Sequence, residues 1–212
     1  MPRTVELTGQ RLEGLLNTPA RAKGLVIFAH GSGSSRLSPR NTYVSQALNR
    51  LGLATLLFDL LTAAEAADRA NVFDIFLLGQ RVAEAVRWAR TETSTAELPL
   101  GLFGASTGAA AALTAAATLP QHVSAVVSRG GRPDLAGSAL ELVCAPTLLI
   151  VGGEDDIVIE LNRRALAALG CEEKKLVIIP GATHLFEEPG TLDEVIAAAG
   201  QWFERHLEKD RT

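Results

Sequence analysis

The sequence predicts an α/β fold, a mostly parallel central sheet with helices on both of its faces. Short and almost wholly apolar runs recur along the chain, such as residues 25–29 and 147–151, and such runs indicate strands that are buried on both faces. Segments with helical periodicity separate them, and this alternation is typical of parallel strands joined by crossover helices. The chain has 212 residues and no linker, repeat or low-complexity segment, so it predicts one domain over residues 1–212.

The expected strands are apolar runs that end at glycine, proline or polar residues. The first two flank the turn at residues 8–11, which contains Gly9, and they therefore predict a hairpin. The later runs are nearly continuous stretches of aliphatic and aromatic residues, as expected of strands covered on both faces. The expected strands cover residues 5–7, 12–16, 25–29, 53–58, 98–103, 123–127, 147–151 and 176–179.

The expected helices separate these strands. Pro39 and Gly52 bracket the first one, because proline suits the first turn of a helix and glycine suits the position after its end. In residues 73–90 the apolar side chains recur at helical spacing, and we expect Phe76 to face the core with the others. The alanine-rich stretch 109–117 predicts a buried helix with close backbone packing. The expected helices cover residues 39–51, 73–90, 107–119, 159–169 and 191–208, with a short segment near 138–143.

Composition excludes several classes of partner and site. The net charge is −4 and no basic cluster is present, so we expect no nucleic acid partner. No apolar run reaches the roughly 18 residues of a membrane helix, and the N-terminus lacks the apolar core of a secretory signal, so we expect no membrane association and a cytoplasmic location. The histidines and acidic residues show no metal-ligand spacing, and the reaction expected below requires no cofactor. Cys144 and Cys171 are expected to be buried free thiols.

The pentapeptide at residues 104–108, Gly-Ala-Ser-Thr-Gly, carries the strongest chemical signal. It lies between an apolar run and the alanine-rich run, which predicts a strand, a sharp turn at Ser106 and then a helix. Such a turn strains the serine backbone, requires tiny residues two positions away, and exposes the hydroxyl at a helix N-terminus. We therefore expect Ser106 to be a nucleophile; the alternative is a structural N-cap of the helix.

Further polar residues directly follow the predicted strands, and the carboxyl ends of parallel strands meet at one edge of a sheet. Serine needs a base within hydrogen-bond reach, and His184, in the loop after the last strand, is the candidate. A carboxylate from the loop 152–158 would orient its imidazole. The residues expected at this edge are His30, Asp59, Ser106, Arg129, Asp155, Asp156 and His184.

These motifs resemble the α/β-hydrolase superfamily, and more narrowly its small lidless members of the dienelactone-hydrolase-like group. The serine turn, the Gly-Gly-x-Asp-x-x-Val stretch at 152–158 and the late histidine match in order and approximate spacing, and the resemblance covers nearly the whole chain. It implies about eight strands, the first one or two antiparallel, and no separate cap domain. It also implies Asp155 as the triad acid, with Asp156 and then Glu154 as alternatives. One departure is that dienelactone hydrolases proper resemble this scaffold but use a cysteine nucleophile, whereas this chain has Ser106, which favours general ester chemistry.

Two backbone amides are expected to stabilise the oxyanion. The N–H of Thr107, directly after the nucleophile, supplies one. The other is expected from Ser32, with Gly33 as the second choice, because residues 30–33 resemble the His-Gly-x-Gly oxyanion loop of the superfamily. His30 itself is expected to brace this loop rather than to act as a second base.

Arginines also follow the predicted strands. Arg36, Arg40 and Arg129, together with Gly33, are candidate substrate-binding residues, because arginine suits a carboxylate or phosphate on the substrate. The alternative is that these arginines brace loops through acidic residues such as Asp59 or through backbone carbonyls.

The expected function is that of a serine hydrolase cleaving a small or soluble carboxylic ester through an acyl-enzyme, with Ser106, Asp155 and His184 as the triad. The segment 128–146 is too short for a helical lid, so the site should be open. A thioesterase or lactonase would use the same triad, and a non-catalytic binding or regulatory protein on the same scaffold is the rival from another class. The expected partner is the ester substrate, and the sequence carries no signal of oligomeric state.

Overall fold

A single eight-stranded sheet forms the centre of the computed structural model, which describes residues 2–7, 9 and 11–207. Its strand order is β1-β2-β4-β3-β5-β6-β7-β8. The hairpin of β1 and β2 is antiparallel, β2 pairs antiparallel with β4, and the remaining pairs are parallel, as the sequence predicts. The strands are β1 (Arg3–Leu7), β2 (Leu12–Asn17), β3 (Leu25–Ala29), β4 (Ala54–Phe58), β5 (Leu100–Ala105), β6 (Ala125–Arg129), β7 (Thr147–Gly152) and β8 (Lys174–Ile179).

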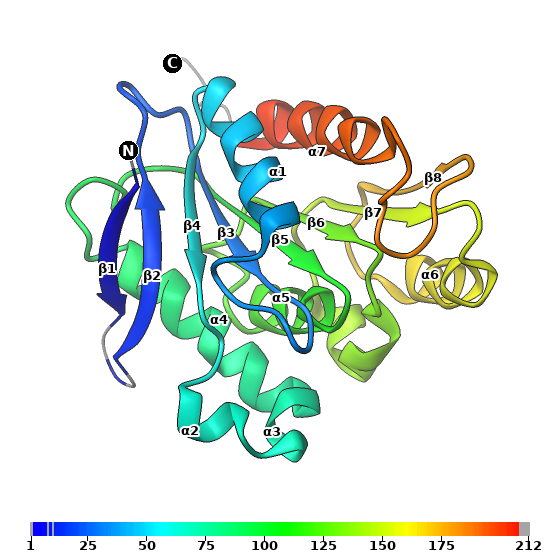
Figure 1. Ribbon diagram of the computed structural model, residues 1–212, viewed down its shortest axis with the longest axis horizontal. Coiled ribbons are helices and arrows are strands. Elements are labelled where there is room, and N and C mark those ends of the chain that lie inside the picture. Colours follow the sequence, from blue (N-terminus) through cyan, green and yellow to red (C-terminus); the bar gives the residue numbers. More distant parts are fainter. Residues whose placement is uncertain (1, 8, 10, 208–212) are drawn as a thin grey trace.

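Helices cover both faces of the sheet (Figure 1). Helices α1 and α7 pack on one face, and α4, α5, α6 and the 3₁₀ segment η1 pack on the other. Two short helices, α2 and α3, precede α4 and bury none of their side chains. The helices are α1 (Pro39–Arg50), α2 (Ala63–Ala66), α3 (Arg69–Phe73), α4 (Ile75–Ala89), α5 (Thr107–Thr118), η1 (Pro133–Leu142), α6 (Asp156–Ala168) and α7 (Thr191–Leu207).

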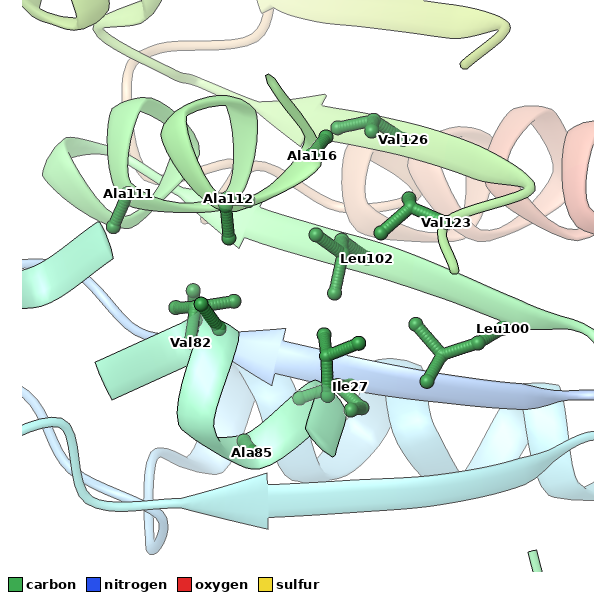
Figure 2. Close-up of a cluster of buried hydrophobic side chains, with 14 of the residues drawn as sticks. Ile27, Val82, Ala85, Leu100, Leu102, Ala111, Ala112, Ala116, Val123 and Val126 are labelled. Carbon is green, nitrogen blue, oxygen red and sulfur yellow. The ribbon is translucent and has the colours of Figure 1, made fainter. Parts of the chain in front are cut away.

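Helix α5 is buried almost completely, and its alanines make this possible. Ala111, Ala112 and Ala116 meet the side chains of α4 and of the strands with no exposed surface or almost none (Figure 2). On the side of α4, Gly79 lies so near Thr114 that an added Cβ would come within 2.7 Å of its methyl carbon. Small residues on both helices therefore allow a close approach, which fixes the start of α5 against the sheet.

The strand order places a topological switch at β3. The chain passes from β3 to β4 on one side of it and then crosses to β5 on the other side. Ligands of parallel α/β sheets bind at such a point, beyond the carboxyl ends of the strands. The loop after β3 and the turn after β5 are thereby brought next to each other.

Several expectations are corrected by the structure. Phe76 is 69% exposed; it precedes the buried Leu78 by two positions, which is roughly 200° around a helix, so the two face opposite ways. Cys144 is exposed, and only Cys171 among the two cysteines is buried. The region near 138–143 belongs to a longer 3₁₀ segment that is interrupted at Gly137. In the hairpin turn expected at residues 8–11, positions 8 and 10 lie outside the described residues.

Candidate active site

Ser106 occupies the sharp turn between β5 and α5 in a strained conformation. Its φ and ψ are 51° and −123°, a region that residues other than glycine rarely adopt. Both flanking glycines are sterically required. A Cβ on Gly104 would lie 2.4 Å from the Cα of Ala109, and one on Gly108 would lie 2.2 Å from the carbonyl oxygen of Ala29. The turn therefore tolerates only hydrogen atoms at these two positions.

The backbone of Ser106 is tied to the loop that follows β6. Its N–H donates to the carbonyl of Arg129 at 3.3 Å, and its own carbonyl accepts from the N–H of Arg132 at 3.1 Å. Thr107 is the first residue of α5, so its N–H has no acceptor within the helix. The Ser106 side chain and the Thr107 N–H are thus held side by side at the positive end of a buried helix.

Asp155 lies at the start of α6 but does not cap it, because its side chain accepts no bond from the helix backbone. The carboxylate instead contacts His184, whose Nδ1 lies 2.6 Å from Asp155 Oδ2. The two alternatives for the acid, Asp156 and Glu154, are exposed. An Nδ1–H that donates to Asp155 leaves Nε2 of the imidazole as a proton acceptor.

The loops that carry Asp155 and His184 are packed tightly together. The N–H of Glu154 donates to the carbonyl of Ala182 at 2.9 Å, and a Cβ on Gly152 would lie 2.3 Å from that same carbonyl oxygen. The His184 loop is braced further, since Glu188 accepts hydrogen bonds from the N–H and the hydroxyl of Thr183 at 3.1 and 2.6 Å. These hydrogen bonds hold the pKa of Glu188 below its usual range.

Ser106 and His184 line one cavity of about 260 Å³, together with Ser32, Arg40 and Arg129. Among the described residues, no hydrogen bond joins the Ser106 hydroxyl to the His184 ring. The loop after β6 contacts both residues: the carbonyl of Arg129 accepts from the N–H of Ser106, and a Cβ on the next residue, Gly130, would lie 2.9 Å from the carbonyl oxygen of His184. The structure thus gathers at one edge the serine, the imidazole and the carboxylate that lie far apart in sequence.

The two expected oxyanion residues are joined by a hydrogen bond. The N–H of Ser32 donates to Oγ1 of Thr107 at 2.9 Å, so this amide already has an acceptor. Gly33 has a φ of 69° and faces a second cavity, described below.

His30 braces the loop after β3, as the sequence predicts. Its Nδ1 lies 2.9 Å from the carbonyl of Gly31, and its Nε2 accepts from the N–H of Leu60 at 3.1 Å. This pair of bonds fits a neutral imidazole that carries its proton on Nδ1. Burial lowers the pKa of His30, which keeps the ring neutral.

The three candidate arginines differ in their partners. Arg36 pairs with both Asp59 and Glu13, and its backbone N–H also donates to Asp59 at 2.7 Å. An anionic substrate would compete with two carboxylates there, so Arg36 braces the loop and leaves the set of substrate-binding candidates. Arg40 lines the cavity and makes an exposed pair with Glu187 at 3.0 Å, a type of pair that contributes little stability.

Arg129 is buried, with 7% of its surface exposed. Among the described residues no carboxylate pairs with it; its Nη2 donates to Asn41 Oδ1 at 3.4 Å, and its Nε has no partner. Its guanidinium lies 5.9 Å from the centre of the Phe186 ring. Burial, with the nearby charge of Arg40, lowers its pKa to about 10, so it remains charged near neutral pH.

A second cavity, of about 290 Å³, also borders the loop after β3. Ser32, Gly33 and Thr107 border it, and its remaining wall comes largely from apolar side chains of the 60–78 segment. These side chains are Leu60, Leu61, Ala63, Ala66, Val72 and Leu78. Gly31, Ser32 and Ser34 line both cavities, so the two adjoin along the loop after β3.

Sequence reasoning missed several parts of this site. Asn41, Phe186 and Glu188 carried no recognised signal, and their contacts depend on how the loops fold. The helices that wall the second cavity did have a signal. Thr62 and Glu65 form a capping box, and this Thr-x-x-Glu spacing is a signature of a helix start.

Two further kinds of feature do not occur in the described part of the chain. Its histidine, cysteine and acidic side chains form no group of three or more that could hold a metal ion. None of its helices combines the length and the apolar composition of a transmembrane span.

Comparison with known proteins agrees with this architecture. The structure is similar to a dienelactone hydrolase from Anabaena variabilis, with 52% identity, a TM-score of 0.92, and coverage of 98% of this chain and 99% of that one. It also resembles an α/β serine hydrolase without a lid from Xanthomonas campestris, at 23% identity and a TM-score of 0.78 over 97% and 95% of the two chains, a likeness that concerns the fold.

A putative phosphoribosyl transferase of Mycobacterium tuberculosis is 59% identical over 194 residues, which cover 92% of this chain but 44% of that protein. The chain thus spans less than half the length of this curated relative. More than half of that protein therefore lies outside the matched segment.

The sequence profile of the dienelactone hydrolase family matches residues 12–209, nearly the full length of the chain. It spans the serine turn, the acid loop and the histidine loop described above. The sheet, the strained serine turn and this match lead to one conclusion: the chain belongs to the dienelactone hydrolase family.

Proposed function

We propose that the protein is a serine hydrolase that cleaves carboxylic esters through an acyl-enzyme, with Ser106, His184 and Asp155 as its triad. One observation carries the proposal: the strained Ser106 shares a cavity with an imidazole whose Nδ1 is held by Asp155 at 2.6 Å. That arrangement leaves Nε2 free to take a proton from the serine hydroxyl.

In the proposed reaction, Ser106 Oγ attacks the substrate carbonyl while Nε2 of His184 accepts its proton. Asp155 stabilises the imidazolium that forms. When the tetrahedral intermediate collapses, His184 gives the proton to the leaving alcohol. Water then attacks the acyl-enzyme with His184 as the base, which restores Ser106. The proton transfers require the serine and the imidazole to approach to hydrogen-bond distance, and such bonds are often long in a free enzyme and tighten with substrate.

The proposed oxyanion donors are the amides of Thr107 and Ser32. Thr107 is available at the start of α5, and Ser32 becomes available when the substrate oxygen takes the place of the Thr107 hydroxyl. Losing one such donor typically costs about 3–4 kcal/mol of transition-state stabilisation. Thioesters and lactones present the same carbonyl, so the same groups would act on them.

Labelling with a fluorophosphonate probe tests the proposal. We expect covalent labelling of the wild-type protein and none of Ser106→Ala. Asp155→Asn should react orders of magnitude more slowly, because loss of the triad carboxylate lowers turnover by about 10⁴-fold in a well-studied triad. Asp156→Asn is the matched control, since its carboxylate is exposed one residue away, and it should react at the wild-type rate. Folded wild-type protein that takes up no probe would favour a non-catalytic binding protein instead.

A further inference from the structure

The two cavities beside Ser106 have opposite chemical character, and the proposed reaction assigns a different part of the substrate to each. In an ester the reacting carbonyl carries an acyl group on one side and an alcohol on the other. The tetrahedral intermediate directs its oxyanion to the amide donors and its leaving oxygen to His184, which must protonate it. The leaving group therefore lies on the His184 side of Ser106, and the acyl group lies away from it.

The His184 side is cationic. The cavity that contains His184 is also lined by Arg129 and Arg40. Arg129 is buried, has no carboxylate partner among the described residues and has an Nε without a hydrogen bond. A buried charge without a partner is unfavourable, and an anion on the leaving group would supply the partner that the described chain does not. The guanidinium lies over the aromatic face of Phe186, a contact that favours its positive charge.

The cavity on the side of Ser106 away from His184 is apolar. The cavity of about 290 Å³ begins at the amide donors, Ser32 and Thr107, and continues between apolar side chains of the segment from Leu60 to Leu78. Its charged or titratable lining residues, His30 and Asp59, are already engaged, His30 with Gly31 and Leu60 and Asp59 with Arg36. An acyl chain that passes the oxyanion donors would enter this cavity and gain by burial.

On the basis of the hydrolase function proposed above, we propose that the substrate is an ester or thioester joining an apolar acyl group to an alcohol or thiol that bears a carboxylate or phosphate. The acyl group occupies the cavity walled by the 60–78 segment, and the anion binds Arg129. The bond from Ser106 Oγ to the acyl carbon forms, the bond from that carbon to the leaving oxygen or sulfur breaks, and the proton of Ser106 leaves with the anionic product by way of His184. Water hydrolyses the apolar acyl-enzyme to the free acid.

Four synthetic esters separate the two subsites: acetyl and hexanoyl esters of 3-hydroxybenzoate, which is anionic, and of 3-hydroxybenzamide, which is neutral. The wild-type protein should favour the anionic leaving group and the longer acyl group in kcat/KM. Arg129→Met should lower kcat/KM for the anionic esters by roughly 10- to 100-fold, the loss expected for a charge-assisted hydrogen bond, and leave the neutral esters unchanged. Arg129→Lys should recover part of the loss. Arg164→Met is the matched control, because Arg164 is exposed and pairs with Glu160 on α6, outside the cavity.

The acyl subsite has its own pair of variants. Ala63→Phe fills the cavity from an exposed position of α2, whereas Ala64→Phe, one residue along, does not line it. Ala63→Phe should lower hexanoyl turnover by at least about 10-fold relative to acetyl turnover, for either leaving group, and Ala64→Phe should not. Ala63→Phe should also change the deacylation rate of the hexanoyl-enzyme. The Arg129 variants should leave that rate unchanged, because the leaving group has departed by then.

The outcomes distinguish this inference from the function on which it rests. A burst of released phenol that shows no preference between the anionic and neutral leaving groups in the wild type would overturn the anion subsite while supporting the serine hydrolase. An equal loss on all four esters in Arg129→Met would also overturn it. If Arg129→Met does not fold, the wild-type protein alone tests the anion subsite. Its preference for the anionic esters should disappear when inorganic phosphate is added as a competitor, and a preference that persists would overturn the subsite. No burst and no fluorophosphonate labelling in folded wild type would end both proposals.

Discussion

Gly108 has no room for even one methyl group, so a single added carbon atom there would disturb the turn that holds Ser106. An added Cβ would lie 2.2 Å and 2.5 Å from the carbonyl oxygens of Ala29 and His30. Both oxygens belong to the backbone at the end of β3, so neither can rotate away. The position of Ser106 is thus set by how closely the start of α5 approaches the neighbouring strand.

We therefore predict that Gly108→Ala lowers the free energy of unfolding by about 1–3 kcal/mol, the usual cost of overpacking, and abolishes fluorophosphonate labelling even where the protein folds. Gly190→Ala is the control, because Gly190 has a φ of 85° but open space around it. It should cost only about 1 kcal/mol of backbone strain and keep its labelling. Urea denaturation and labelling of both variants check this; equal behaviour of the two would contradict it.

His30 makes the loop after β3 sensitive to acid. Its folded-state pKa is lowered by burial from the ordinary 6.5, so below that pH the unfolded chain binds more protons than the folded one. The contribution of His30 to the free energy of unfolding is therefore fully present above about pH 6.5. It is lost as the pH falls toward the lower pKa that His30 has in the folded state. The protonated ring can no longer accept from the N–H of Leu60.

We expect the urea midpoint of the wild type to fall between pH 7.5 and pH 5.5 by more than that of His30→Gln. The comparison between the two proteins is essential, because burial also lowers the pKa of His206 and that contribution cancels in the difference. The same fall in both proteins would show that His30 is not the group responsible.

At the scale of the element, helix α4 shows how one cap is coupled to the core. Asp74 precedes its first residue and accepts from the N–H of Leu77 at 3.0 Å, and the helix buries a continuous face against the sheet and α5. Helix α3 has a similar cap, in which Asp68 accepts from Ala70 at 2.9 Å, but it buries no side chain.

Asp74→Ala should therefore reduce the free energy of unfolding by about 1 kcal/mol, as is typical for loss of an N-cap, whereas Asp68→Ala should leave it nearly unchanged. Thermal denaturation of the two variants checks this, since both remove one exposed aspartate near the same helices. A larger loss in Asp68→Ala would mean that α3 contributes to global stability after all.

Elements with a continuous apolar signal could be predicted from the sequence, and those without one could not. The eight strands and the five main helices were expected within a few residues, since each buries an apolar run. Helices α2 and α3 bury nothing, so no periodicity marks them. Strand β5 begins at Leu100 rather than at residue 98, and Pro99, which has no N–H for the ladder, precedes it.

The same contrast applies to the candidate site. The serine turn and the order of the acid and the histidine were readable because each lies at a fixed place after a strand. The partners of the arginines were not readable, because Arg36 meets Asp59 only when two loops of different strands fold together. Likewise the bond between Ser32 and Thr107 joins residues 75 positions apart.

At the scale of the whole molecule, no helical lid lies between β6 and β7. That interval holds only the 3₁₀ segment η1, whose buried residues pack against the body of the protein. We predict that turnover follows the concentration of dissolved substrate smoothly through the onset of micelle formation. Rates on a short-chain ester series measured across that concentration check this, and an abrupt rise at the onset would contradict it.

The alanine face of α5 has a consequence for how this protein can change. Every position from Ala109 to Ala112 is fully buried, so almost any larger residue there would displace the Ser106 turn. The loops and short helices around the two cavities carry no such restriction. In a library of random variants selected for a new substrate, accepted changes should gather in the segments 32–40 and 60–78, while the helix behind the serine stays as it is. The rigidity that holds the serine in place also confines adaptation to the surroundings of the site.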